Sequence, residues 1–163
     1  MRIVRLCTIV LARFLISAVF LAGGISKIIN WHETEKLVAN ILCDWQSYVG
    51  FSETAQTCFA MAVPWTPLIL ITGTLFELVG GLCILLGLRE KLGATLLILF
   101  LIPATILMHQ FWFIETGDRE LQTVMFLKNL ALFGGLLMVL LHGAQGKAGA
   151  RAESDGMPSF KLG

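Results

Sequence analysis

Four ionisable side chains lie within long apolar stretches of the sequence, and they are the residues best placed to do chemistry. They are Lys27, Glu77, His109 and Lys128. Placing an ionisable group inside a bilayer is costly, so such residues commonly bind ligands, relay protons or pair with one another. A carboxylate near lysine and histidine donors would suit proton coupling, or the binding of a ligand with acceptor oxygens.

Helical spacing predicts that these four side chains lie in the same half of the membrane. At about 1.5 Å per residue, Glu77 lies roughly 15 Å from Pro67, and Lys128 lies roughly 10 Å into its own stretch. Lys27 and His109 each lie within roughly 6 Å of the same edge. Each of the four stretches therefore contributes one ionisable group to this half.

Small residues at helical spacing predict which way the side chains face. They are Gly23 and Gly24 beside Lys27, Gly73, Gly80 and Gly81 beside Glu77, and Ala131 and Gly135 beside Lys128. Small residues mark contact faces in lipid because they let helix backbones approach closely. We therefore expect one inward-facing polar cluster, made of Lys27, Glu77, His109, Lys128 and Asn129.

Three interpretations of this cluster are open from the sequence. It could bind a ligand or couple to proton transfer. Alternatively, Glu77 could pair with Lys128 or Lys27 only to neutralise its charge and set the register of the helices. The cluster could also serve contacts between subunits. Lys27 could instead extend to nearby headgroups, and Arg13 is expected to do so at the opposite edge.

The remaining reactive side chains give weaker signals. Cys43 and Cys58 lie in one loop and could form a disulfide in an oxidising compartment, or serve as two separate small apolar residues. A metal site is not expected, because two of the cluster residues are cationic and no His/Cys pair has ligand spacing. The sequence contains no CxxC pair, P-loop, nucleophile-elbow or dinucleotide-binding motif.

The composition shows what must position these residues. Of the 163 residues, 56% are hydrophobic and 14% are charged, and the mean hydropathy is +0.81, whereas soluble domains have about 25% charged residues. Four stretches are long enough to span a bilayer: about 7–29, 67–88, 92–113 and 121–141. We predict an all-α integral membrane protein, a four-transmembrane-helix bundle that forms a single domain over residues 1–143.

The long loop of residues 30–66 is expected to contain helix of its own. Apolar residues recur there at helical spacing, at Leu37, Val38, Ile41, Leu42 and Trp45. This pattern predicts a short amphipathic helix that lies in the membrane interface between the first two spanning helices. A second short helix is expected from Ser52, as its N-cap, to Ala62.

The distribution of basic residues predicts the orientation. The side with both termini holds Arg2, Arg5, Arg13, Arg89, Lys91, Lys147, Arg151 and Lys161, whereas the loops of the other side hold Lys36 and Arg119. Basic residues favour the cytoplasmic side, so both termini are expected to be cytoplasmic, in a bacterial inner membrane.

Residues 144–163 are expected to form a disordered cytoplasmic tail. The net charge of +1 gives no sign of nucleic-acid binding.

Four short segments in order resemble the DoxX family of membrane proteins. They are Gly24–Lys27, Glu77–Gly81, Pro103–Trp112 with His109, and Phe126–Gly135 with Lys128 and Asn129. The resemblance covers roughly residues 10–143. It implies a compact four-helix bundle in the cytoplasmic membrane and a membrane subunit or anchor of a redox complex, with quinone as a candidate ligand. It carries over no catalytic residues.

Two classes of function follow from the residues and the resemblance together. As a redox subunit, the chain would bind quinone with Lys128 and His109 on the carbonyl oxygens and with Glu77 relaying protons. As a carrier, it would use the same cluster for a small solute or lipid, although four helices are few for alternating access unless a homo-oligomer adds more. A purely structural membrane partner is a third option. A stand-alone enzyme is the least supported, because little chain lies outside the spans.

Overall fold

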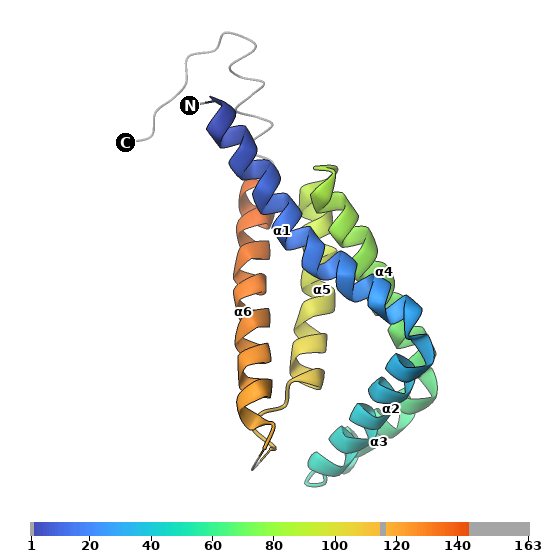
Figure 1. Ribbon diagram of the computed structural model, residues 1–163. Helices are drawn as coiled ribbons and strands as arrows, with labels where there is room; N and C mark the ends of the chain where they lie inside the picture. The colour runs from blue at the N-terminus through green and yellow to red at the C-terminus, as the bar shows by residue number, and fades with distance from the viewer. Residues whose placement is uncertain (1, 115–116, 144–163) are drawn as a thin grey trace.

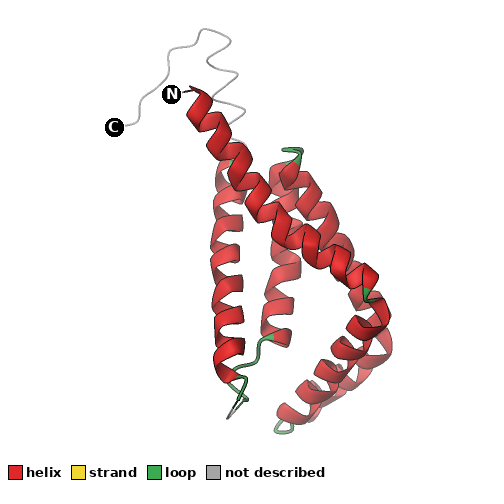
Figure 2. Cartoon of the chain, in the orientation of Figure 1, coloured by secondary structure: helices red, strands yellow, loops and turns green. Residues whose placement is uncertain are grey.

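The computed structural model describes residues 2–114 and 117–143, and all regular structure in this part of the chain is helical (Figures 1 and 2). The predicted tail, residues 144–163, lies outside the described residues. The elements are α1 (Arg2–Ile29), α2 (Trp31–Tyr48), α3 (Glu53–Ala62), the 3₁₀ turn η1 (Val63–Trp65), α4 (Thr66–Leu85), α5 (Glu90–Met108) and α6 (Arg119–His142). The prediction of an all-helical chain is thus confirmed for the described residues.

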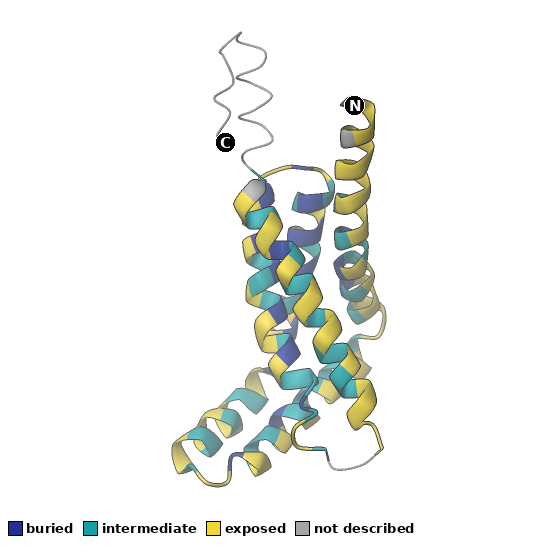
Figure 3. Cartoon of the chain, turned by 90° about the vertical axis from the view of Figure 1, so that its left-hand side faces the viewer, coloured by how far each residue is buried: buried dark blue, intermediate teal, exposed yellow. Residues whose placement is uncertain are grey.

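Four helical segments in the described part are long and apolar enough to cross a membrane. They are Leu6–Ile29 in α1, Glu53–Leu85 from α3 to the end of α4, Glu90–Met108 in α5 and Arg119–Leu141 in α6. Their apolar side chains cover the outer surface, whereas the buried positions face the interior (Figure 3). A surface of this kind suits lipid, because apolar side chains exposed on every side are unfavourable in water.

The four long helices pack in series. Helix α1 packs on α4, α4 packs on α5, and α5 packs on α6. A core of fully or nearly fully buried side chains, Phe20, Ile84, Leu97 and Leu136 among them, joins the four helices. Helix α1 crosses the others obliquely and diverges from α6 toward the hairpin end (Figure 1); it meets α6 near its own middle, where a Cβ atom on Gly135 would lie 3.8 Å from Cδ1 of Ile16.

Two glycines set the separation between α4 and α5. A Cβ atom on Gly80 would lie 3.0 Å from the Gly93 carbonyl oxygen and 2.7 Å from Cγ of Leu97. A Cβ atom on Gly93 would lie 2.9 Å from the Gly80 carbonyl oxygen. The two backbones are therefore in direct contact, a geometry that only residues without side chains permit.

Helices α2 and α3 form a hairpin at the end of the molecule opposite the start of α1 (Figure 1). The predicted N-cap is confirmed, since the Ser52 hydroxyl accepts a hydrogen bond of 3.4 Å from the Ala55 amide. The indole Nε1 of Trp45 donates to the carbonyl oxygen of Leu107 at 3.2 Å. That carbonyl belongs to the last turn of α5, where intrahelical donors run out, so Trp45 fastens the hairpin to the end of α5.

Helix α5 ends five residues before the predicted position, and this is a correction to the sequence analysis. The prediction of a helix over 92–113 placed His109 within the last full turn, whereas α5 ends at Met108 and His109 is its C-cap. The physical reason is aromatic packing beyond the helix end. The Phe113 ring stacks on Tyr48 at 4.3 Å and meets Trp45 edge-on at 5.5 Å, contacts that a continued helix would direct elsewhere.

We expect Gly80→Ala to destabilise the protein and Gly134→Ala to leave it unchanged or slightly more stable. The first substitution forces atoms into the α4–α5 contact, at a cost of about 1–3 kcal/mol. The second adds a methyl group in open space, with nothing within 4 Å, and alanine is favoured over glycine in a helix by about 1 kcal/mol. Thermal unfolding of both variants in the same detergent measures the difference. Equal shifts in Tm would contradict a tight α4–α5 contact.

Candidate functional site

The centre of the candidate site is an ion pair between α1 and α4. The Nζ atom of Lys27 lies 2.6 Å from Oε2 of Glu77 and donates a hydrogen bond to it. Glu77 is buried, at 4% exposure, whereas Lys27 is only partly buried. Of the two pairings left open by the sequence, the structure contains Glu77 with Lys27 and not with Lys128.

Two glycines of α1 make this pair possible. A Cβ atom on Gly23 would lie 2.5 Å from Oε1 of Glu77, and one on Gly24 would lie 2.6 Å from Cδ2 of Leu78. Any larger residue would push α1 away from α4 and lengthen the Lys27–Glu77 contact. The small residues that predicted a packing face beside Lys27 therefore do mark one.

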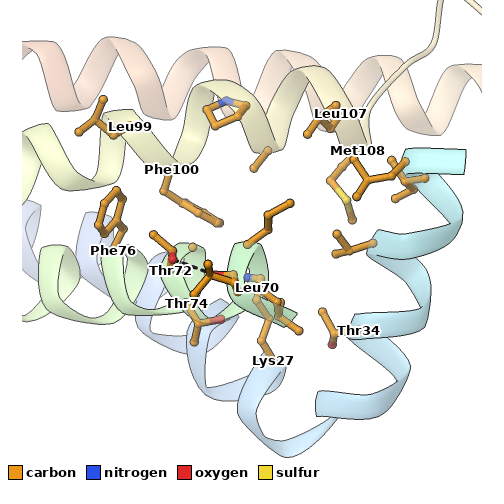
Figure 4. A pocket seen from close by; sticks show the side chains of 18 residues that line it. Lys27, Thr34, Leu70, Thr72, Thr74, Phe76, Leu99, Phe100, Leu107 and Met108 are labelled. Atoms are coloured by element: carbon orange, nitrogen blue, oxygen red, sulfur yellow. Dashed lines mark hydrogen bonds between the residues drawn. The ribbon is translucent and has the colours of Figure 1, made fainter. Parts of the chain in front are cut away.

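A cavity of about 430 Å³ lies beside the ion pair, between the end of α1 and helices α2, α4 and α5 (Figure 4). This volume falls in the range of about 300–1,000 Å³ that is typical of small-molecule sites. Most of the lining is apolar, and it includes Leu70, Phe76, Phe100, Pro103, Leu107 and Met108. Lys27 is the only charged residue among the residues that line it.

Two further features give the cavity a polar end. Thr74 lines the cavity on the same face of α4 as Glu77, and its buried Oγ1 has no hydrogen-bond partner. The Lys27 ammonium group lies 5.2 Å from the centre of the Phe100 ring, within cation–π range. A ligand at this end would therefore meet an ammonium donor and an aromatic ring, and it would reach the covered Thr74 hydroxyl only if that side chain turned toward the cavity.

One wall of the cavity comes from the hairpin. Thr34, Val38, Ile41 and Leu42 of α2 line it, and the last three belong to the apolar face predicted from the sequence. The α2 helix thus presents this face to α4 and α5, at least in part, and closes one side of the cavity.

The other predicted cluster residues have different neighbours. Nδ1 of His109 lies 2.8 Å from Oε1 of Gln122, and this contact joins the end of α5 to α6. Lys128 is exposed, and its Nζ atom lies 3.8 Å from Sδ of Met125 on the same helix. Asn129 lines a smaller hollow of about 160 Å³ between α5 and α6. None of the three lines the cavity beside Lys27.

The geometry of α6 explains why Lys128 does not join the pair. The buried side of this helix is centred on Leu136, and Asn129 lies on that side, seven residues before it. Lys128, one residue earlier, is turned by about 100° around the helix axis and is carried out of the packing face. Of the two small residues expected beside Lys128, Ala131 is exposed too, whereas Gly135 lies against Ile16 of α1.

A second ion pair, which the sequence analysis did not anticipate, joins Arg13 of α1 to Glu90 at the start of α5. Arg13 was expected to extend toward headgroups, whereas it reaches the buried Glu90 carboxylate. The tight α4–α5 turn permits this approach, because Gly87 adopts φ +65° and a Cβ there would lie 2.6 Å from Arg13 Nη1. No spacing pattern linked these residues, which lie 77 positions apart.

The disulfide considered from the sequence is not formed in the structure. Cys43 of α2 and Cys58 of α3 are free thiols, and both are exposed. They lie on the outside of the hairpin and not in the contact between its helices. The alternative interpretation, two separate side chains, describes them.

The site can hold an apolar molecule with a small polar end. An ammonium group carries three donors, and Glu77 takes one of those of Lys27, which leaves donors for a ligand. Because Lys27 and Glu77 balance each other's charge, the site favours a neutral group with acceptor oxygens over a second carboxylate. The sequence did not predict Thr74 and Phe100 as site residues. Thr74 could have been found from its spacing, because it lies three residues from Glu77 and so shares its helical face.

Comparison with known proteins places the site within a matched region. The family model described as DoxX matches residues 8–110 of the chain. The inner membrane protein YqjF of Escherichia coli (strain K12) is 33% identical over 103 residues, which make up 63% of this chain and 74% of the relative. No solved structure matches the chain. The family match includes Lys27, Glu77 and the cavity, and it ends before α6.

We expect Lys27→Met to destabilise the protein strongly, and Lys27→Met/Glu77→Met to recover much of the loss. Breaking a buried pair leaves an uncompensated charge and costs about 3–5 kcal/mol, whereas apolar replacement of both partners is far less harmful. Glu77→Met alone should cost less than Lys27→Met, because Lys27 is partly exposed. A double-mutant cycle from unfolding in detergent measures this.

The matched control is the exposed pair of Lys36 and Glu33, 3.5 Å apart on α2. Its cycle should give less than about 1 kcal/mol. If the Lys27 and Glu77 substitutions proved additive, the ion pair would not contribute to stability.

Proposed function

Because the chain belongs to the DoxX family of membrane proteins, we propose that it is the membrane subunit of a quinone-linked redox complex and that its cavity binds the quinone ring. The observation that carries the proposal is the polar end of an otherwise apolar cavity, where Lys27 retains free donors; the buried hydroxyl of Thr74, a second polar lining residue, has no partner. A quinone supplies two-electron, two-proton chemistry when bound. Its electrons would come from a separate redox subunit.

The lining matches the chemical character of a quinone. A quinone ring is neutral, planar and apolar apart from two carbonyl oxygens, which are acceptors. Lys27 and Thr74 are donors for one of these oxygens, and Phe100 offers a flat surface beside Lys27. A fatty acid fits less well, because its carboxylate would approach Glu77, whose oxygen lies 2.6 Å from Lys27.

Lys27 and Glu77 are also suited to proton exchange. The pair is the ionisable group at the cavity, and a proton shared between Nζ and Oε2 is within one hydrogen bond of an oxygen held by Lys27. This assignment replaces the one expected from the sequence, in which His109 and Lys128 hold the oxygens. Those two residues lie on other surfaces of the molecule.

A photoreactive quinone analogue tests the proposal on the purified full chain. We expect labelling of cavity residues on α4 or α5, and we expect competition by unlabelled quinone. Thr74→Val should reduce labelling several-fold by removing the hydroxyl at nearly constant volume. Ala104→Phe should reduce it by filling the cavity without touching the ion pair. Lys36→Met, an exposed lysine of α2, is the control and should label as the wild type does.

Three outcomes would overturn the quinone assignment. Labelling that ignores both Thr74→Val and Ala104→Phe would place the quinone elsewhere. Co-purification of a phospholipid or another solute in the cavity, with no competition by quinone, would favour the carrier function. A cavity that binds neither would leave a structural role in the complex.

We further propose that the hairpin lies at the outer face of a bacterial inner membrane, with both termini cytoplasmic and with α2 in the interface. The excess of basic residues on the side of the termini supports this orientation. The relative from Escherichia coli, described as an inner membrane protein, supports the choice of membrane. The exposed apolar residues Leu37 and Phe51 of the hairpin suit contact with headgroups and acyl chains.

The free thiols of the hairpin test the orientation directly. In intact cells, a membrane-impermeant maleimide should label Cys58 in a variant whose other cysteines are replaced. Lys91→Cys, at the exposed α4–α5 turn, should be labelled only after the cells are permeabilised. The reverse pattern would show that the hairpin faces the cytoplasm.

A further inference from the structure

Helix α6 carries a lysine with no acidic partner in the described part of the chain. Lys128 lies within the span Arg119–Leu141. Its side chain is exposed, and its contact is the Met125 sulfur at 3.8 Å. An ammonium group at such a place in a membrane is costly unless an acidic or otherwise polar group meets it.

Extension to the membrane surface does not fully relieve this cost. Lys128 is nine residues from Arg119 at the start of α6, which is roughly 13 Å along the helix. This distance exceeds the length of an extended lysine side chain. Snorkelling would shorten the path of the charge to the headgroups, but the ammonium group would remain below them.

Within residues 2–114 and 117–143, no spare carboxylate lies at this depth. Glu77 and Glu90 are buried, and they pair with Lys27 and Arg13. A second copy of the chain would present the same paired groups and could not neutralise Lys128 with them. Charge complementarity therefore points to a carboxylate from a different polypeptide.

The surface around Lys128 is free to receive a helix. Gly135 lies seven residues away on the same flank of α6, and a Cβ there would lie 3.8 Å from Ile16 of α1. Toward Lys128, α1 diverges from α6 (Figure 1), so the flank formed by Val124, Lys128 and Ala131 is exposed. Helix α6 otherwise packs on α5.

We propose that this flank of α6, Val124, Lys128 and Ala131, docks a transmembrane helix of a partner protein that carries an aspartate or glutamate opposite Lys128. The inference rests on the proposed role as a subunit of a complex, and it names the surface and the chemistry of the contact. The flank is separate from the cavity, which lies between α1, α2, α4 and α5. The partner helix would fill the space where α1 and α6 diverge.

The test uses the full chain in its native membrane, with a photo-crosslinking amino acid at Ala131. The control position is Leu75, an exposed apolar residue of α4. We expect position 131, and not 75, to capture one membrane protein whose spanning helix holds an acidic residue. Lys128→Glu should lower recovery of that protein at least tenfold on native gels. Exchanging its acidic residue for lysine should restore the complex with Lys128→Glu.

Other results would overturn the proposal. Capture of a second copy alone would make the flank a self-association surface, and capture of lipid alone would assign Lys128 to phosphate groups. A complex that survives Lys128→Glu and Lys128→Met would exclude the ion pair. Quinone labelling of the same variants separates this inference from the proposed function, because Lys128 variants should keep the label and Thr74→Val should keep the partner.

Discussion

A charge buried away from water must be neutralised nearby, and this constraint organises the protein. Two ion pairs meet it, Lys27 with Glu77 and Arg13 with Glu90, and both begin on α1. They fasten that helix to α4 near its C-terminal end and to the start of α5 near its middle. Glycines at these contacts allow the ion pairs to form, because Gly23, Gly24 and Gly87 leave the space in which the charged groups meet.

Helix α4 packs closely on both α1 and α5, whereas a cavity remains between these helices and α2. Helices α1 and α4 approach closely at Gly23 and Gly24, toward the end of α1, and α4 and α5 do so at Gly80 and Gly93, near the turn that joins them. Helix α2 packs on α4 and α5 and lines the cavity with branched apolar residues. Between them lies the cavity, whose charged residue is also half of an ion pair. A group that holds the helices together is thus also the group that a ligand would meet. Substitution of Lys27 is therefore expected to change both stability and ligand binding, whereas substitution of Thr74 or Ala104 is expected to change binding and leave the ion pair intact.

The oblique course of α1 divides the molecule into two functional surfaces. Where α1 stays close to α4, it closes the cavity; where it diverges from α6, it leaves Lys128 uncovered. The family match covers the first surface and ends before the second. In the proposed roles, the first surface would hold the ligand and the second would meet the partner helix.

Hydropathy and residue spacing in the sequence determined the number of spanning helices, the helical hairpin and the importance of Lys27 and Glu77, because apolar length and the cost of buried charge are local properties of a chain. The family resemblance could also be read from short segments in order. The sequence could not determine which charges pair. Arg13 and Glu90 are 77 positions apart, and they meet only because of the tight turn between α4 and α5. It misplaced His109 and Lys128, because α5 ends early to pack aromatic rings and because Lys128 is turned away from the buried side of α6, which is centred on Leu136. The cavity, with Thr74 and Phe100, depends on how far α2 leans from α4, and only the tertiary structure decides that distance.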